Sequence, residues 1–179
     1  MVWVFFIMNF LEKDLEEIIF DNLKTTKRRE QLYFRGLEFD YKTVYGIKRQ
    51  LHIGNYGKAD IVFLNKQICD KKEIIFDKKI TIVELKKDNI NLGTLLQASR
   101  YAKGIKIFLE EREKEKYLFE IILIGKNIDD NSDWVYLFDI LDISNVHIYK
   151  YVYNIDGISF QKINLHDYSL TNNGFNNEN

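Results

Sequence analysis

The stretch "TIVELKKDNINLGTLLQASRY" (Thr81–Tyr101) decides the fold, because an apolar strand pattern changes to a helical one within it. The run "ITIVEL" (80–85) is β-branched with almost no polar alternation, which predicts a central strand buried on both faces. Beyond it, apolar residues recur at helical spacing, and we expect a helix over 91–112. The expected inward side chains are Leu92, Leu95, Leu96, Ala102 and Ile105.

The segments around this stretch alternate between helical and extended patterns. Before it, "FLEKDLEEIIFDNL" (10–23) predicts a helix, and "KRQLHI" (48–53) and "KADIVFLNKQIC" (58–69) predict strands. After it, "YLFEIILIG" (117–125) predicts a buried strand, and "VHIYKYVYNIDGISFQKI" (146–163) predicts a hairpin that turns at "NIDG". A helix, three strands, a helix, a strand and a β-rich extension together predict an α/β sandwich around a mixed sheet.

One domain is the expectation for a chain of 179 residues. We expect it to span 1–165, with a core at about 10–125 and a C-terminal β-rich extension at about 134–165, followed by a polar tail over 166–179. The opening "MVWVFFIM" is too short to span a bilayer and lacks the basic start of a signal peptide. The single Cys69 fits a reducing compartment, so we expect a cytoplasmic protein without a membrane partner.

Charge is nearly balanced overall but uneven along the chain. The formal net charge of −1 excludes a protein that binds nucleic acid through an overall positive charge. Residues 24–58, however, hold nine bases and three acids, a net charge of +6. A local basic surface can guide a polyanion even when the total is near neutral, and a solvated loop and strand edge would show the same composition.

Five polar residues fall where two strands and the following helix would meet. Asp60 follows a glycine turn and begins an apolar strand. Glu84 and Lys86 are two residues apart at the end of the central strand, so their side chains share one face. Gln97 and Tyr101 are four residues apart on the predicted helix and also share a face. Each fits a surface role when taken singly, but their order along the chain favours a shared site.

The end of a strand buried on both faces is a costly place for charged side chains unless they are paired, hydrated or bound to a metal. Two carboxylates from adjacent strands repel each other, and a divalent cation removes that conflict. Mg²⁺ prefers oxygen ligands and keeps several waters. Asp60, Glu84 and the backbone carbonyl of Leu85 could supply those oxygens, and Lys86 could orient a water or neutralise charge building on a phosphate. Metal-assisted hydrolysis of phosphodiesters uses such a set of groups.

The motifs "KADIVFL", "VELKK" and "QASRY" resemble the Asp, Glu-x-Lys and Gln-x-x-x-Tyr motifs of the PD-(D/E)XK nuclease superfamily. The nearest pattern is the catalytic domain of the nuclease-S-type endonucleases; archaeal Holliday-junction resolvases and RecB-type nucleases share the core. The resemblance covers about Leu11 to Ile124. It implies an α/β fold with a restriction-endonuclease-like αβββαβ core, in which a central mixed sheet is flanked by helices, plus the C-terminal β-rich extension.

The resemblance also implies a role for each matching residue. Asp60 and Glu84 would be metal ligands and Lys86 the catalytic lysine, with Mg²⁺ or Mn²⁺ as the cofactor. Gln97 and Tyr101 would support the site or the scissile phosphate. The chain departs from the family pattern in the interval between the aspartate and the glutamate, which at 24 residues is longer than the compact pattern.

The acidic segment "LEKDLEEII" (11–19) resembles the first helix of the superfamily, which carries a glutamate. Glu12 is preferred to Glu16 for this role, because the family's glutamate usually lies three residues before an inward leucine, here Leu15. Glu16 is expected to be a solvated helix charge. A second departure is Ala59, which stands where many members have proline before the aspartate.

The function implied is a Mg²⁺- or Mn²⁺-dependent endonuclease acting on DNA in repair, restriction or phage defence. Two alternatives are a catalytically silent nucleic-acid-binding or assembly module on the same fold, and a nuclease subunit that needs a partner in a larger complex. Tyr149, Tyr151 and Tyr153 alternate on one strand, a pattern typical of packing against the core or a second copy, as in a homodimer, and compatible with base stacking. The sequence leaves open whether the substrate is single-stranded, duplex, branched or RNA.

Overall fold

One mixed sheet organises the part of the chain that the structure, a computed structural model, describes: residues 12–66, 78–111, 117–129 and 145–164. Its strands follow the order β1-β2-β3-β4-β5-β6, so neighbours in sequence are also neighbours in the sheet. The strands are β1 (Val44–His52), β2 (Lys58–Lys66), β3 (Lys78–Leu85), β4 (Tyr117–Gly125), β5 (Val146–Asn154) and β6 (Gly157–Lys162). The helices are α1 (Glu12–Leu23), α2 (Thr26–Phe34) and α3 (Leu92–Glu110), with a 3₁₀ turn η1 (Gly54–Tyr56) between β1 and β2.

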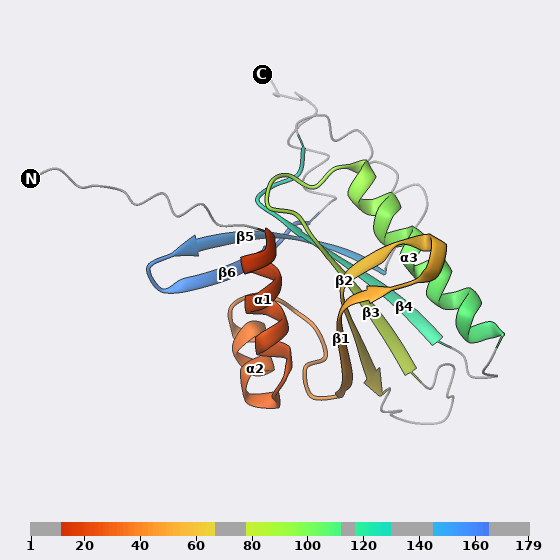
Figure 1. Ribbon diagram of the computed structural model, residues 1–179. Helices are drawn as coiled ribbons and strands as arrows, with labels where there is room; N and C mark the ends of the chain where they lie inside the picture. The colour runs from red at the N-terminus through yellow and green to blue at the C-terminus, as the bar shows by residue number, and fades with distance from the viewer. Residues whose placement is uncertain (1–11, 67–77, 112–116, 130–144, 165–179) are drawn as a thin grey trace, which may run out of the picture.

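Strand direction divides the sheet into three parts. β1, β2 and β3 are antiparallel neighbours. β3 and β4 run parallel because α3 carries the chain back between them, and β5 is parallel to β4. β5 and β6 form the expected antiparallel hairpin. The described chain is therefore an α/β protein with a mixed sheet flanked by helices (Figure 1), as the sequence predicts.

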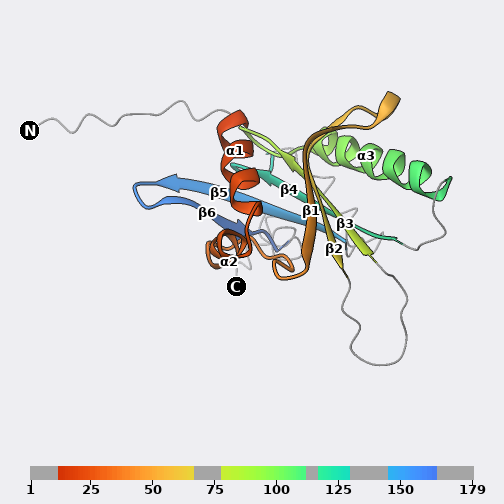
Figure 2. The same ribbon diagram turned by 60° about the horizontal axis from the view of Figure 1, so that its bottom comes forward.

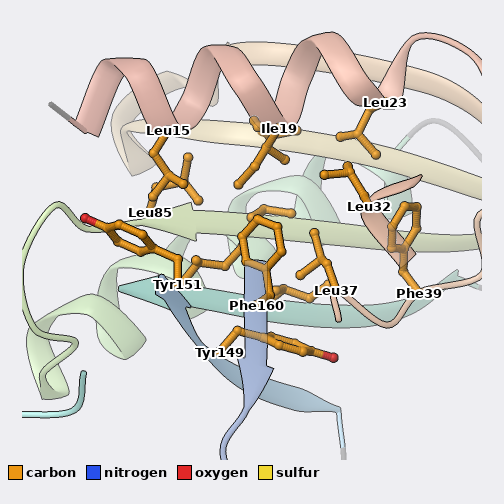
Figure 3. Packing of buried hydrophobic residues seen from close by; sticks show 14 of the residues in the cluster. Leu15, Ile19, Leu23, Leu32, Leu37, Phe39, Leu85, Tyr149, Tyr151 and Phe160 are labelled. Carbon is orange, nitrogen blue, oxygen red and sulfur yellow. The ribbon is translucent and has the colours of Figure 1, made fainter. Parts of the chain in front are cut away.

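The α1–α2 pair covers one face of the sheet. Leu15, Ile19 and Leu23 lie four residues apart along α1 and point down onto the sheet, where they meet Leu85 of β3 and Phe160 of β6 (Figure 3). Helix α2 is missing from the sequence prediction, because its segment "TKRREQLYF" is mostly polar. The side chain of Thr25 caps its first turn, and Arg29 and Leu32 are its buried residues.

Helix α3 covers the opposite face, and Figures 1 and 2 show it lying apart from the α1–α2 pair. Asn91 begins it with a capping box, in which the side chains of Asn91 and Thr94 bond each other's backbone amides. Its buried residues are Thr94, Leu95, Ala98, Tyr101 and Gly104. The predicted inward positions of Leu92 and Leu96 are wrong: Leu96 is 59% exposed, because the stripe that contacts the sheet is narrower than the apolar pattern suggests.

The paired ribbon of β1 and β2 bends across the sheet edge and reaches α3 (Figure 1). Arg49 contacts Glu16 of α1, yet Leu51, two residues later, packs with the cluster under α3. Strict alternation would place both side chains on one face, so the ribbon turns over between them. Gly104 permits the close approach, since a Cβ there would stand 2.6 Å from the ring of Tyr56.

Among the described helices, none is long and apolar enough to cross a membrane. Several sequence predictions lie outside the described residues. They are the start of the first helix, the end of the second strand at Cys69, the part of the C-terminal extension before residue 145, and the tail over 166–179. The central strand is confirmed as buried on both faces, since Ile80 to Leu85 are all buried.

Candidate functional site

Asp60 and Glu84 lie on adjacent strands, one position beyond the paired residues Ile61 and Val83. The register of β2 against β3 therefore places the two carboxylates side by side, as the sequence predicts from their strands. Asp60 Oδ2 accepts a hydrogen bond of 2.9 Å from the backbone amide of Leu85. Burial is the largest influence on Asp60 and raises its pKa, while the bond from Leu85 acts in the opposite direction. Asp60 is thus fixed to the end of the central strand.

Glu84 is the least satisfied charged group of the site. Its side chain is 1% exposed, and it points to the α3 face because Val83 and Leu85 on either side of it pack under α1 and α2. Oε1 accepts a bond of 2.9 Å from Lys86 Nζ, whereas Oε2 has no hydrogen-bond partner among the described residues. Burial, followed by the charge of Asp60, raises the pKa of Glu84 to about 7. A buried carboxylate oxygen without a partner is costly, and such a group indicates a place for a ligand.

Lys86 begins a chain of polar contacts that runs from the strand to the helix. Its Nζ lies 3.5 Å from Gln97 Oε1, and Gln97 Nε2 donates a bond of 2.7 Å to the hydroxyl of Tyr101. The ring of Tyr101 packs closely against Gly57, just before β2, since a Cβ on that glycine would lie 2.8 Å from the ring. Burial opposes the charge on Lys86, but the bond to Glu84 raises the pKa of the lysine above its ordinary value. The ammonium is therefore a fixed cation beside two carboxylates.

Two carboxylates of α1 approach the same region in different ways. Glu12 Oε2 accepts a bond of 3.1 Å from the backbone amide of Lys87, just after β3. Glu16 is 7% exposed, so the expectation that it is a solvated helix charge is wrong. Its Oε1 accepts from Arg49 Nε at 2.6 Å and its Oε2 from Gln50 Nε2 at 2.7 Å. Hydrogen bonds from β1 therefore hold Glu16 in a buried position, whereas Glu12 contacts the backbone just after β3.

Gln50 is a site residue that the sequence prediction does not contain. Its side chain amide also lies 3.4 Å from Asp60 Oδ1, so it bridges the carboxylates of Glu16 and Asp60. Its backbone has a φ of +52°, the only positive φ of a non-glycine residue among those described. This conformation costs about 1–2 kcal/mol for an L-residue. A lone glutamine between Arg49 and Leu51 gives no sequence signal, because its role depends on the bend of the ribbon.

The basic segment 24–58 is only partly a surface feature. Arg29 is buried and donates to the backbone carbonyls of Tyr41 and Val44. Arg35 donates to the carbonyl of Ile158, and Arg49 is paired with Glu16. These arginines hold the fold together. Two exposed cations of the segment are engaged within the protein, Lys24 with Asp21 and Arg35 with the Ile158 carbonyl. The other exposed cations, which could meet a polyanion, are Lys27, Arg28, Lys42, Lys48 and Lys58.

The carboxylates of Asp60 and Glu84 provide oxygen ligands of the kind that a divalent cation prefers. In the described part of the chain no three His, Cys, Asp or Glu side chains are grouped so that they could hold a metal ion. Mg²⁺, however, is commonly bound by one or two carboxylates with waters completing its shell. The unpartnered Oε2 of Glu84, next to Asp60, supplies that minimal donor set. Asp60 and Glu84 therefore fit such an ion, and the role of the Leu85 carbonyl stays a prediction.

The five residues predicted as a group thus lie in one neighbourhood, with Glu12 at its edge. Comparisons with family models, with curated proteins and with solved structures found no match to this chain. Its function is therefore inferred from the chemistry of Glu84 and its neighbours.

Proposed function

We propose that this protein is a Mg²⁺- or Mn²⁺-dependent endonuclease that hydrolyses phosphodiester bonds in DNA. One observation carries the proposal: a buried glutamate, Glu84, keeps one carboxylate oxygen without a described partner beside a second carboxylate and a lysine. A purely structural ion pair would be expected to satisfy both oxygens, because leaving one bare lowers stability. Two carboxylates and a fixed cation at one strand end suit the binding and hydrolysis of a phosphodiester.

The arrangement of elements supports a restriction-endonuclease-like αβββαβ core for this activity. α1 precedes three antiparallel strands, and α3 then leads to β4, which is parallel to β3. α2 is an addition to that order, and the hairpin of β5 and β6 extends the sheet beyond β4. The carboxylates stand at the ends of the two neighbouring strands β2 and β3, the position that the superfamily motifs imply.

Asp60, Glu84 and the carbonyl of Leu85 would hold the cation. When bound, it would supply positive charge to the phosphate and lower the pKa of a water. The protein's own contribution is to keep the two carboxylates together despite their repulsion, which the bond from the Leu85 amide to Asp60 and the bond from Lys86 to Glu84 achieve. The site is thereby prepared for a cation before it arrives.

Lys86 would stabilise negative charge that develops on the phosphate. An ammonium on a four-carbon stem is mobile unless its partners hold it. Here Glu84 and Gln97 hold it on two sides, and the bond from Gln97 to the buried Tyr101 fixes the amide so that its oxygen faces the lysine. Gln97 and Tyr101 therefore act as positioning residues for the lysine.

DNA is the proposed partner, and its backbone would be held by exposed cations near the site. Arg100 lies over the ring of Tyr101, with 5.8 Å between its guanidinium carbon and the ring centroid, and Lys58 follows the turn that packs on that ring. Phosphate contacts of this kind give binding that weakens with salt and reads little sequence. Assembly with a second copy of the chain, or into a larger repair or defence complex, is a further proposal that no contact of the described residues tests.

The test is a cleavage panel with single-stranded, duplex, flap and junction DNA and with RNA, in Mg²⁺, Mn²⁺ or EDTA. Wild type should cut at least one DNA form only when metal is present. Glu84→Gln, which keeps the shape of the side chain, should lose the activity, while Glu17→Gln on the exposed side of α1 should retain it. Metal-independent cutting, or full activity in a folded Glu84→Gln protein, would sink the proposal.

The second candidate is a catalytically silent nucleic-acid-binding module on the same fold. The observation that favours it is the lack of a three-ligand cluster in the described residues. Calorimetry with Mg²⁺ and Mn²⁺ separates the two candidates. Heat that disappears in Asp60→Asn supports the nuclease, and DNA binding without any metal heat supports the silent module.

A further inference from the structure

We propose that Gln50 is a positioning residue that ties the metal-binding aspartate to α1 and keeps its carboxylate in place. The inference rests on the proposed function, and it assigns a role to a residue outside the motifs of the site. It is motivated by three observations at one position: the positive φ of Gln50, the two carboxylates that its amide contacts, and the turning over of the ribbon there.

The contacts form a continuous path from α1 to the end of the central strand. Glu16 accepts from Gln50 at 2.7 Å, the same amide nitrogen reaches Asp60 Oδ1 at 3.4 Å, and Asp60 Oδ2 accepts from the Leu85 amide at 2.9 Å. Arg49 holds the other oxygen of Glu16 at 2.6 Å. Each oxygen of Glu16 and of Asp60 therefore faces a donor, in contrast to Glu84.

The amide of Gln50 also separates two groups that would otherwise repel. One amide nitrogen of Gln50 lies 2.7 Å from Glu16 Oε2 and 3.4 Å from Asp60 Oδ1, so the two carboxylates are close enough to interact. An amide nitrogen between them offers a hydrogen to each without adding charge. A shorter side chain would remove the bridge, and a glutamate would add a third negative charge.

The backbone of Gln50 is strained, which lowers stability relative to a glycine at the same position. Glycine adopts a φ of +52° readily, whereas glutamine is strained in this region. Strained residues persist where the surrounding structure forces them, and they gather at functional sites. The left-handed conformation turns the strand so that the Gln50 amide reaches Asp60 while Leu51 packs toward α3.

The test exploits this strain with a pair of glutamine-to-glycine variants. Gln50→Gly removes the amide and relieves the backbone, while Gln161→Gly, in the exposed part of β6, removes a glutamine from an ordinary extended position. We expect Gln50→Gly to melt at or above the wild-type temperature, yet to bind Mn²⁺ and cleave DNA about 10- to 100-fold more weakly, the usual effect of losing a residue that orients a ligand. Gln161→Gly should melt at a lower temperature with unchanged metal affinity and cleavage.

Hydrogen exchange of the Leu85 amide provides a readout that needs no activity, because that amide donates to Asp60. In metal-free Gln50→Gly it should exchange about tenfold faster than in wild type, with the amide of Val83 unchanged as the internal control. Unchanged Leu85 exchange, or wild-type metal affinity in Gln50→Gly, would overturn the role of Gln50. If wild type neither binds metal nor cuts while the Leu85 amide still responds, the proposed nuclease function is wrong and the positioning of Asp60 by Gln50 stands.

Discussion

Glu84 and Glu120 are carboxylates of neighbouring strands, β3 and β4, and their surroundings drive their pKa values in opposite directions. Burial and the charge of Asp60 raise the pKa of Glu84 to about 7. Burial acts on Glu120 in the same sense, but hydrogen bonds from His147, Thr81 and Lys79 outweigh it and lower the pKa to about 2. Desolvation is common to both residues, so the difference in pKa comes from the charge of Asp60 beside Glu84 and from the larger number of donors around Glu120.

The two residues also face opposite sides of the sheet. Glu120 is paired with Thr81 in the register of β3 and β4, on the face that α1 and α2 cover. Lys79 lies 3.1 Å and Thr81 2.9 Å from its Oε2, and His147 lies 3.4 Å from its Oε1. Glu84 has one donor, Lys86, which bonds Oε1, and its Oε2 has no hydrogen-bond partner among the described residues. The donors around Glu120 stabilise the fold, whereas Oε2 of Glu84 has room for a ligand.

The largest expected difference between the two residues is in catalysis. If the proposed function holds, Glu84→Gln should lower the rate of metal-dependent DNA cleavage by roughly 100- to 1000-fold, because it removes a carboxylate that would hold the cation. Glu120→Gln should cut at the wild-type rate. The measurement is the initial rate of cleavage for the three proteins at one pH and metal concentration. Equal losses of cleavage rate in both variants would show that the different surroundings of Glu84 and Glu120 do not matter for catalysis.

The next difference concerns the stability of the metal-free protein as pH rises. The folded protein holds a proton on Glu84 more tightly than the unfolded chain, since the pKa is raised from 4.5 to about 7. The free energy of unfolding should therefore fall by on the order of 3 kcal/mol between about pH 4.5 and 7 and then level off. Urea unfolding in EDTA across this range measures the slope, which Glu84→Gln should flatten.

The pKa shift of Glu120 has the opposite sign to that of Glu84, so it affects the free energy of unfolding in a different pH range. Its pKa is lowered from 4.5 to about 2, so its contribution to stability is complete above about pH 4.5 and is lost as the pH falls toward 2. The two titrations therefore do not overlap. A slope above pH 5 that persists in Glu84→Gln would contradict the assignment of that slope to Glu84.

Loss of the saturated carboxylate should show in stability instead. Glu120→Ala removes the acceptor of three donors and leaves Lys79 close to His147, which should cost about 2 kcal/mol at pH 7. The melting temperature should then drop by about 4–8 °C. Differential scanning calorimetry checks the drop, and the cleavage rate of the variant below its melting temperature should equal that of wild type. If the melting temperature falls no more than it does for a substitution at an exposed position, Glu120 does not stabilise the fold.

Strand and helix periodicity was sufficient to predict the central features of the Glu84 site, whereas the contacts of Glu120 were not predicted. Alternation along β3 places Glu84 and Lys86 on one face, and the four-residue spacing in α3 places Gln97 beside Tyr101. These relations depend on local geometry, which a sequence pattern contains. The sequence predicts that Asp60 and Glu84 lie on adjacent strands, but it does not determine the register between those strands. The structure shows that register, and it places the two residues side by side.

Other features depend on tertiary geometry, which sequence periodicity does not contain. The bridge from Glu16 through Gln50 to Asp60 exists only because the β1–β2 ribbon turns over at Gln50. α2 escaped prediction because it has almost no apolar stripe and buries Arg29 where a leucine would be expected. The outward position of Leu96 depends on how α3 is rotated against the sheet.

The smallest predicted effect is the stabilisation of the protein by metal, and it separates the two carboxylates without any substrate. An ion that binds the folded state alone raises the free energy of unfolding by about 1.4 kcal/mol at ten times its dissociation constant. For a chain of this size, the melting temperature should rise by about 3–5 °C in Mn²⁺ or Mg²⁺. Glu120→Gln should show the same rise as wild type from a lower starting point, because its carboxylate is already saturated by protein donors. Glu84→Gln should show none, and a full rise in that variant would place the ion elsewhere in the molecule.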